Sequence, residues 1–305
     1  MSNKLQKPFL KWIGGKTQII NSIIERFPPE INNYYEPFLG GGSVLLALLT
    51  LQQQGAIVIS GTIHASDINP SLINVYKHVQ TKKKLLHDFI TFYISEYDGI
   101  TGTVVNREAE SIEEAKTSKE SYYYWIRKKF NEMKRNETLG TKKLVECSAL
   151  FMFLNKTCFR GMYREGPNGY NVPYGHYKKT PTIITKSNLY TISKLIKCVV
   201  FTCSEFNLQA AIPGDFVYID PPYAPETKTS FVKYTTKGFG LEKHEELFGD
   251  VRKIHEKGVK FCMSNSKVSL VLENFQDCNC IDIVARRAIN SKKPGSTTTE
   301  VIIYN

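Results

Sequence analysis

The sequence predicts an α/β protein with a mostly parallel sheet and helices on both faces. Short β-branched segments suited to strands alternate with longer stretches whose apolar residues recur at helical spacing. The 305 residues are enough for one large domain or for a core domain with an insertion. No apolar run reaches the roughly 18 residues of a membrane span, so we expect a soluble protein.

Helix and strand signals alternate through the first hundred residues. Residues 17–27 carry apolar side chains at helical spacing, and the prolines at 28 and 29 end that helix. Residues 44–55 predict a second helix, closed by Gly55, and residues 56–67 predict a strand. A further helical pattern runs from about 72 to 97.

A change of composition at residues 111–143 indicates an inserted region. Residues 116–143 hold nine Lys or Arg against three Glu, with Tyr122, Tyr123, Tyr124 and Trp125 among them. One interpretation gives this region a task of its own. The other is a solvated helix face whose aromatic side chains pack inward.

Strand signals return after residue 194. The segments are KCVVFTC (197–203), DFVYID (215–220), KFCMSN (260–265), CIDIVAR (280–286) and EVIIYN (300–305). Residues 241–257 predict a helix closed by Gly258.

The charge balance favours an anionic partner. Forty Lys and Arg against 29 Asp and Glu give a formal charge of +11, which attracts polyanions such as nucleic acid. The polar N-terminus shows no secretory pattern, so we expect an intracellular location: cytoplasm or nucleoid, or a host cell if the chain is viral. The seven cysteines and six histidines show no zinc-ligand spacing, so we expect reduced thiols and no metal site.

Residues 36–43, EPFLGGGS, suit a nucleoside ligand. Three glycines let the backbone approach a ligand closely, and the helix that follows offers unpaired N–H groups. The stretch lacks the P-loop and dinucleotide patterns, which disfavours a pyrophosphate. Asp67, at the end of the next strand, is placed to bind ribose hydroxyls. The alternatives are a plain glycine turn, and an N-cap role for Asp67 before the helix near Pro70.

The stretch DFVYIDPPY (215–223) ends an apolar strand in an acid, two prolines and a tyrosine. Because proline fixes φ and lacks an N–H, the Asp220 carboxylate and the Pro221 carbonyl form two fixed acceptors, which suit an NH2 group. Tyr223 adds a flat face for stacking. Holding both hydrogens of a conjugated amine makes its nitrogen a better nucleophile. With S-adenosylmethionine as the nucleoside, these residues predict methyl transfer to a planar amine; the alternative is a structural Pro-Pro turn.

These motifs, in this order, give the chain a resemblance to the Dam-type DNA adenine-N6 methyltransferases, the α group of amino-methyltransferases. FLKWIGGK (9–16) looks like the opening motif, EPFLGGGS the cofactor loop, ASDIN (65–69) the ribose acid and DPPYAP (220–225) the catalytic motif. YYWIRKKFN (123–131) and RRAINSKKPGSTTTEVIIYN (286–305) are similar to two further family segments. LNKTCFRGMYREGPNGYNVPYGHY (154–177) is similar to the family's DNA-reading hairpin. The resemblance covers nearly the whole chain.

The resemblance implies a Rossmann-like methyltransferase sheet with helices on both faces, plus an inserted, mainly helical target-recognition domain carrying a β-hairpin. Residues 1–75 and 195–305 would form the catalytic domain that binds S-adenosylmethionine. Residues 76–194 would form the DNA-binding insert, with its hairpin at 154–177.

The resemblance also implies residue roles. The catalytic residues would be Asp220, Pro221, Pro222 and Tyr223. The cofactor contacts would be Trp12, Lys16, Glu36, Pro37, Phe38, Gly40, Gly42, Ser43, Asp67, Ile68, Glu205, Phe206 and Asp220. The DNA contacts would be Lys11, Arg127, Asn155, Phe159, Arg160, Met162, Arg164, Asn171, Pro173 and Tyr177. Ile68 and Phe206 would sandwich the cofactor adenine, with plain core packing as the alternative. Arg164 would donate to a guanine, and Phe159 would insert where the adenine leaves the stack.

The implied activity is methyl transfer from S-adenosyl-L-methionine to the N6 amine of a flipped-out adenine in double-stranded DNA, with GATC as the expected target. A cognate restriction endonuclease would be a partner if the enzyme serves restriction-modification. The alternatives are a methyltransferase for cytosine-N4 or RNA, and a non-catalytic DNA-binding relative. Arg160, Met162 and His176 depart from the commoner family pattern, but Arg164 does not.

Overall fold

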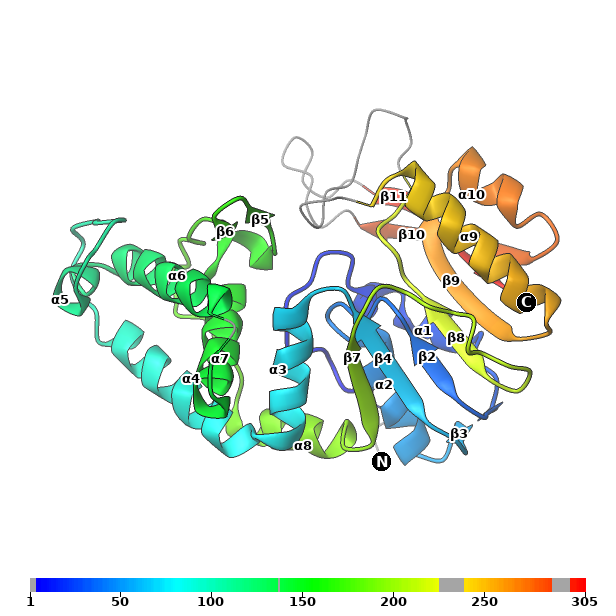
Figure 1. Cartoon of the computed structure of the whole chain (residues 1–305), viewed down its shortest axis with the longest axis horizontal. Coiled ribbons are helices and arrows are strands. Elements are labelled where there is room, and N and C mark those ends of the chain that lie inside the picture. The colour runs from blue at the N-terminus through cyan, green and yellow to red at the C-terminus, as the bar shows by residue number, and fades with distance from the viewer. Residues whose placement is uncertain (1–3, 137, 225–238, 287–296) are drawn as a thin grey trace. The chain divides into compact units, whose positions relative to one another are not determined.

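The computed structural model describes residues 4–136, 138–224, 239–286 and 297–305, and the chain divides into two compact units (Figure 1). Unit 1 comprises residues 1–8, 14–69 and 198–305. Unit 2 comprises residues 9–13 and 70–197. The expected division, 1–75 with 195–305 against 76–194, differs from these units at residues 9–13, 70–75 and 195–197, which belong to unit 2.

Unit 1 is built on a mixed sheet. Among the described residues, seven strands pair in the order β10-β11-β9-β8-β2-β4-β7. The strands are β2 (Tyr34–Glu36), β4 (Ile63–Asp67), β7 (Val199–Cys203), β8 (Phe216–Ile219), β9 (Lys260–Ser266), β10 (Asn279–Arg286) and β11 (Thr297–Tyr304). The five from β9 to β7 are parallel, whereas β11 pairs antiparallel with β9 and β10. The predicted α/β sheet of mostly parallel strands is confirmed.

The order of the strands reverses between β2 and β8. From β2 the chain proceeds outward to β4 and β7; β8 then lies on the other side of β2 and is followed by β9. Ligands of open α/β sheets bind beyond the carboxyl ends of the strands at such a switch point. The segments that follow these two strands are the glycine loop after Glu36 and the Asp220–Tyr223 motif.

Both faces of this sheet are covered, as β8 shows. Val217 and Ile219 pack in one core with apolar residues of the helix α9 (Leu241–Glu256). Phe216 and Tyr218 alternate with them and face the other side, where the Phe27 ring centroid lies 4.5 Å from that of Phe216. Burial on both faces explains why this strand reads as a continuous apolar run. The remaining elements of unit 1 are η1 (Lys16–Gln18), α1 (Ile20–Ile24), β1 (Glu30–Ile31), α2 (Ser43–Gln53), β3 (Val58–Ile59), α9 (Leu241–Glu256) and α10 (Ser269–Asn274).

Two predicted elements are each divided in the structure. The predicted strand 56–67 forms β3 and β4, because the chain turns at Gly61, where a Cβ would lie 2.3 Å from Asn33 Oδ1. The predicted helix 72–97 forms two helices that separate at Lys82, whose φ is −129°. The predicted glycine stops are confirmed, since Gly55 and Gly258 have φ values of 75° and 82°.

Unit 2 is mainly helical. Its helices are α3 (Pro70–Thr81), α4 (Lys83–Asp98), α5 (Ile112–Ala115), α6 (Lys119–Arg135), α7 (Thr141–Thr157), η2 (Phe159–Gly161) and α8 (Lys186–Leu195). Tyr122, Tyr123 and Tyr124 of α6 are buried, so these aromatic side chains pack inward as the second interpretation predicted. None of the described helices is long and apolar enough to cross a membrane.

The predicted hairpin at 154–177 is shorter than expected. Helix α7 continues to Thr157, and the paired strands are only β5 (Glu165–Gly166) and β6 (Gly169–Tyr170). An isolated bridge between Cys158 and Tyr174 holds the flanking segments together.

Candidate active site

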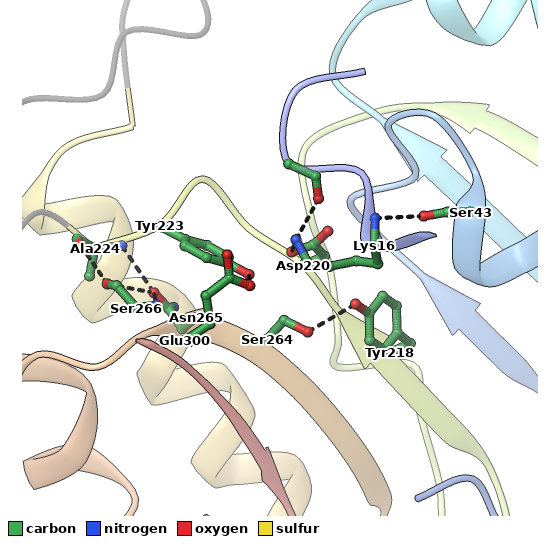
Figure 2. Close-up of polar contacts among 11 residues, drawn as sticks. Lys16, Ser43, Tyr218, Asp220, Tyr223, Ala224, Ser264, Asn265, Ser266 and Glu300 are labelled. Atoms are coloured by element: carbon green, nitrogen blue, oxygen red, sulfur yellow. Dashed lines mark hydrogen bonds and ion pairs between the residues drawn. The ribbon is translucent and has the colours of Figure 1, made fainter. Parts of the chain in front are cut away.

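Asp220 follows β8 directly and forms a largely buried ion pair with Lys16 (Figure 2). Lys16 Nζ lies 2.8 Å from Asp220 Oδ1, and the two side chains are 4% and 19% exposed. Lys16 Nζ also donates to the Gly14 carbonyl oxygen at 2.6 Å, and the Lys16 backbone N–H donates to Ser43 Oγ at 3.1 Å. The opening motif, the glycine loop and the Asp220 motif therefore meet at the switch point of unit 1.

Burial and charge set the protonation of Asp220. Burial raises the pKa of its carboxyl group to about 6; the Lys16 ammonium acts in the lowering direction, and the Glu300 charge in the raising direction. The carboxylate is therefore ionised at neutral pH, with a proton bound only under acidic conditions. An ionised carboxylate accepts hydrogen bonds at both oxygens.

Tyr223 is fixed by two charged groups. Its hydroxyl donates to Glu300 Oε2 at 2.8 Å, and Lys16 Nζ lies 4.7 Å from the centroid of its ring. Burial, with the Asp220 and Glu300 charges, raises the pKa of Tyr223 well above its usual value, so its hydroxyl remains a donor. These contacts hold the ring in one orientation beside the Asp220 carboxylate (Figure 2).

The backbone just after the motif is anchored to the end of β9. Asn265 Oδ1 accepts from the Ala224 N–H at 3.0 Å, and Ser266 Oγ donates to the Ala224 carbonyl at 2.5 Å. Pro225, the last residue of the quoted motif DPPYAP, lies outside the described residues, as do residues 287–296 of the C-terminal motif.

Asp67 holds the glycine loop through a backbone hydrogen bond. Gly40 and Gly42 have φ values of 49° and 67°, in the region that favours glycine. Asp67 Oδ2 accepts from the Gly40 N–H at 3.0 Å, and Oδ1 accepts from the Asn69 N–H at 2.9 Å. Burial raises the pKa of Asp67, and these two backbone bonds act in the opposite direction. The acid thus joins the ends of two adjacent parallel strands, β2 and β4.

Glu36 is deeply buried, and its carboxyl group is mostly protonated at neutral pH. It is 2% exposed, and burial, the largest cause, raises its pKa to about 8. Tyr34 Oη donates to Glu36 Oε2 at 2.6 Å. Of its neighbours in the loop, Pro37 is buried, whereas Phe38 is half-buried and lies 5.6 Å from Phe206 between ring centroids.

The residues expected at a cofactor adenine lie at the ends of neighbouring strands. Ile68 follows β4 and is 49% exposed, which excludes plain core packing for this side chain. Phe206 follows β7 and is half-buried against the core. Glu205 is exposed and forms an ion pair with Lys243 at 3.0 Å.

Unit 2 holds the predicted DNA-contacting residues. Phe159 is 42% exposed just after α7, and the Arg160 guanidinium lies 5.1 Å from the centroid of its ring. Arg160 has φ of 55°, an uncommon conformation for a residue other than glycine. Lys11 Nζ donates to Tyr177 Oη at 3.1 Å, which in turn donates to the Cys158 carbonyl at 3.0 Å.

Two predicted contacts have structural partners within unit 2. Asn155 is 4% exposed, and its side chain accepts from the Lys11 N–H at 2.9 Å and donates to the Lys11 carbonyl at 2.7 Å. The structure therefore gives Asn155 the task of holding Lys11. Trp12, a predicted cofactor contact, stacks on Tyr163 with ring centroids 5.7 Å apart.

Side chains of helix α6 form hydrogen bonds with the hairpin backbone. Tyr123 Oη and Arg127 Nη1 donate to the Val172 carbonyl at 2.8 and 3.4 Å. Asn131 accepts from the Tyr170 N–H at 2.8 Å and donates to the Tyr170 carbonyl at 2.9 Å. Tyr123, Arg127 and Asn131 are four residues apart and therefore lie on one face of α6. In this structure the YYWIRKKFN motif supports the hairpin.

Arg164, in the exposed segment leading into β5, is oriented by Asn171. Its Nε donates to Asn171 Oδ1 at 2.7 Å, and its Nη2 donates to the Asn171 carbonyl at 3.3 Å. Arginine has five N–H donors, so three remain for another ligand. Met162 is half-buried, and Pro173, whose carbonyl accepts from the Phe159 N–H at 2.8 Å, is exposed.

Glu300, Asn265 and Ser266 were not singled out from the sequence. Asn265 and Ser266 are the last two residues of β9, so the strand-end rule that identified Asp220 would also have found them. Glu300 gave no local signal, because its partner Tyr223 is brought to it only by the position of β11 beside β9.

One group in the described part of the chain has spacing compatible with a metal ion. The ligand atoms of His255, Asp277 and Cys278 lie within 4.8 Å of one another. Asn305 Oδ1 accepts from the Phe261 N–H, so its Nδ2 is the atom that donates to His255 Nδ1 at 2.8 Å. The hydrogen of a neutral ring is then on Nε2, which faces Asp277, and no ring lone pair is left for a metal.

Comparison with known proteins gives one family and several full-length relatives. A family model described as "D12 class N6 adenine-specific DNA methyltransferase" matches residues 12–289. The chain is 37% identical to "Type II methyltransferase M.MjaIII" of Methanocaldococcus jannaschii, with 98% of this chain and 99% of the relative covered. It is 31% identical to "Type II methyltransferase M1.LlaDCHI" of Lactococcus lactis subsp. cremoris, covering 99% and 97%. It is 28% identical to "DNA adenine methylase" of Serratia marcescens, covering 94% and 93%.

Proposed function

The chain belongs to the D12 class of N6 adenine-specific DNA methyltransferases, and from this membership we propose how its residues divide the work. S-adenosyl-L-methionine is the methyl donor, unit 1 carries the reaction, and unit 2 selects the DNA site. The target is an adenine in the sequence GATC. The observation that carries this proposal is the ionised Asp220, paired with Lys16, at the end of β8 and at the switch point of the sheet.

The glycine loop and Asp67 would hold the methyl donor. Gly40 and Gly42 carry no Cβ, so the loop backbone can approach a ligand closely, and no P-loop pattern is present in the loop to hold a pyrophosphate. Asp67 has lone pairs beyond those that accept from Gly40 and Asn69, so ribose hydroxyls could share its oxygens. When bound, S-adenosylmethionine supplies a methyl group on a sulfonium, which a nucleophile can attack.

Asp220 and Pro221 would hold the target amine. The N6 amine of adenine donates its lone pair to the ring and is a poor nucleophile. Two acceptors that hold its hydrogens, the Asp220 carboxylate and the Pro221 carbonyl, favour a tetrahedral nitrogen with an available lone pair. The Tyr223 ring, fixed by Glu300 and Lys16, would stack on the base. Positioning and electrostatics supply most of the rate enhancement in such a step.

Unit 2 would contact the duplex from its hairpin and its basic residues. An enzyme that modifies a base must extract it from the stack, and the exposed Phe159 ring is available to occupy the gap. The three N–H groups of Arg164 that Asn171 leaves unused can donate to O6 and N7 of a guanine. The Arg160 guanidinium lies over the Phe159 ring, and Lys11 is hydrogen-bonded to Tyr177.

Methylation protection tests the target sequence. DNA that contains every tetranucleotide is incubated with the protein and S-adenosylmethionine, then digested with nucleases that adenine methylation blocks. We expect protection at GATC and cleavage at every other site. Full cleavage at GATC with protection elsewhere would reject this target while leaving adenine methylation intact.

The names of two relatives indicate restriction-modification as the cellular setting. Both are called type II methyltransferases, and a cognate endonuclease with the same site would then accompany this chain. Cleavage of unmethylated GATC DNA by a protein encoded next to this one would support that assignment.

A further inference from the structure

His244 of α9 lies next to the catalytic motif and bonds to its backbone. The residue is 0% exposed, and its Nε2 lies 3.0 Å from the Pro222 carbonyl oxygen. Its Nδ1 lies 2.8 Å from the carbonyl oxygen of Gly240, the residue that precedes α9. Both carbonyl oxygens only accept, and a neutral imidazole has a single N–H. The Gly240 carbonyl already accepts from the His244 backbone N–H at 3.2 Å, so we assign the ring hydrogen to Nε2, which donates to Pro222.

The ring is also held in place by aromatic packing. Phe239 and Phe248 make edge contacts with it, at centroid distances of 4.7 and 6.0 Å. Such packing fixes the direction in which Nε2 points. A fully buried histidine needs a partner for its N–H, and here that partner belongs to the backbone of residues 220–223.

We propose that His244 is a positioning residue for methyl transfer: its Nε2–H donor fixes the Pro222 carbonyl and thereby aims the Pro221 carbonyl and the Tyr223 ring at the target base. The inference rests on the proposed roles of residues 220–223. The ring of Pro222 fixes its φ. One torsion, ψ of Pro222, then separates the carbonyl that His244 holds from the Pro221 carbonyl that would accept from the amine. The same peptide plane leads into Tyr223, whose hydroxyl is held independently by Glu300.

Two kinds of substitution separate positioning from packing. His244→Gln retains an N–H donor on a side chain of similar reach. His244→Met has a similar length without a donor, and His244→Phe retains an aromatic ring without a donor. His255→Phe is the matched control, since His255 lies on the same helix but bonds to Asn305, away from the motif.

Single-turnover methyl transfer, cofactor affinity and DNA affinity are measured for each folded variant. We expect His244→Met and His244→Phe to lower the rate of methyl transfer about 10- to 100-fold, with both affinities within about twofold of wild type. His244→Gln should recover most of the rate, and His255→Phe should retain it. Using two variants without a donor keeps the comparison valid if one of them fails to fold.

The outcomes distinguish this inference from the function on which it rests. A wild-type rate in either donor-free variant would overturn the role of His244, as would equal losses in His244→Gln and His244→Met. An active wild type with an inactive Asp220→Ala variant would leave the proposed function standing in that case. If Asp220→Ala were as active as wild type, the proposed role of the motif would fall instead.

Discussion

Replacing Lys16 with methionine should move the acid limb of methyl transfer to higher pH. In the proposed mechanism an ionised Asp220 accepts from the amine, and its pKa of about 6 reflects burial opposed by the Lys16 ammonium. At 2.8 Å and an effective dielectric constant of about 20, the gross attraction between these charges is about 6 kcal/mol. Carboxylates beside one opposite charge have a pKa lower by about 1–3, because desolvation offsets part of that attraction.

The direction follows from the sign of the lost charge. Without the ammonium the carboxylate is less stable, the pKa of Asp220 rises, and a proton binds at higher pH. We expect the acid limb to move up by about 1–3 pH units. A move of two pH units would lower the ionised fraction at pH 7 about tenfold.

Glu300→Gln should move the same limb in the opposite direction. The Glu300 charge raises the pKa of Asp220, so its removal lowers that pKa. The movement should be smaller than for Lys16→Met, since Glu300 acts on Asp220 less strongly than Lys16 does. The glutamine oxygen can still accept from the Tyr223 hydroxyl, so the ring keeps its support.

The assay is single-turnover methyl transfer at saturating cofactor and DNA, from pH 5 to pH 9. Saturation separates the titration of Asp220 from any loss of cofactor affinity in Lys16→Met. Lys253→Met, which removes an exposed lysine paired with Asp250, is the matched control and should leave the limb unchanged. An unmoved limb in Lys16→Met, or movement of both variants in the same direction, would refute this electrostatic account.

Three further predictions test the cofactor loop, the base reader and the stability of unit 2. Asp67→Ala should weaken S-adenosylmethionine binding about 10- to 100-fold in calorimetric titration, because hydrogen bonds to a charged group are worth about 1.5–3 kcal/mol; unchanged affinity would contradict it. Arg164→Ala should cost about 1–3 kcal/mol in kcat/KM at one guanine, measured on sites with single base changes, whereas a uniform loss at all sites would exclude base reading. Glu146→Gln should lower the free energy of unfolding by about 3 kcal/mol at neutral pH, since the neutral amide loses the ion pairs that the buried carboxylate forms with Lys129 and Lys143. The bonded Glu146 has a pKa of about 2, so its contribution is present at neutral pH and lost as the pH falls toward 2; a penalty as large in denaturant unfolding at pH 2.5 as at pH 7 would contradict this origin.

The location of the glycines and acids of the candidate site could be predicted from the sequence. Gly40 and Gly42 lie in the loop after β2, Asp67 ends β4, and Asp220 follows β8. Hydrophobic pattern and turn chemistry alone indicate these positions. The sheet brings all of them to one edge. The local signal and the three-dimensional position agree here because parallel strands place their carboxyl ends together.

Contacts between distant segments were not predictable in the same way. Lys11 bonds to Asn155, 144 residues away, and Phe9 packs on Tyr76, so residues 9–13 join unit 2. Glu300 reaches Tyr223 only because β11 is inserted between β9 and β10. In the sequence His244 is one of six dispersed histidines, and no local pattern pairs it with Pro222, 22 residues earlier. Pairing of this kind depends on tertiary topology, which a local pattern does not encode.

The central claim is that Asp220 directs methyl transfer to the N6 amine of adenine. Labelled methyl transfer from S-adenosylmethionine to duplex DNA, followed by nucleoside analysis, tests it directly in the wild type and in Asp220→Ala. We expect the label in N6-methyldeoxyadenosine for the wild type, and a loss of about 100-fold or more for Asp220→Ala with cofactor binding retained. Label on cytosine, or near-wild-type turnover by Asp220→Ala, would contradict the claim.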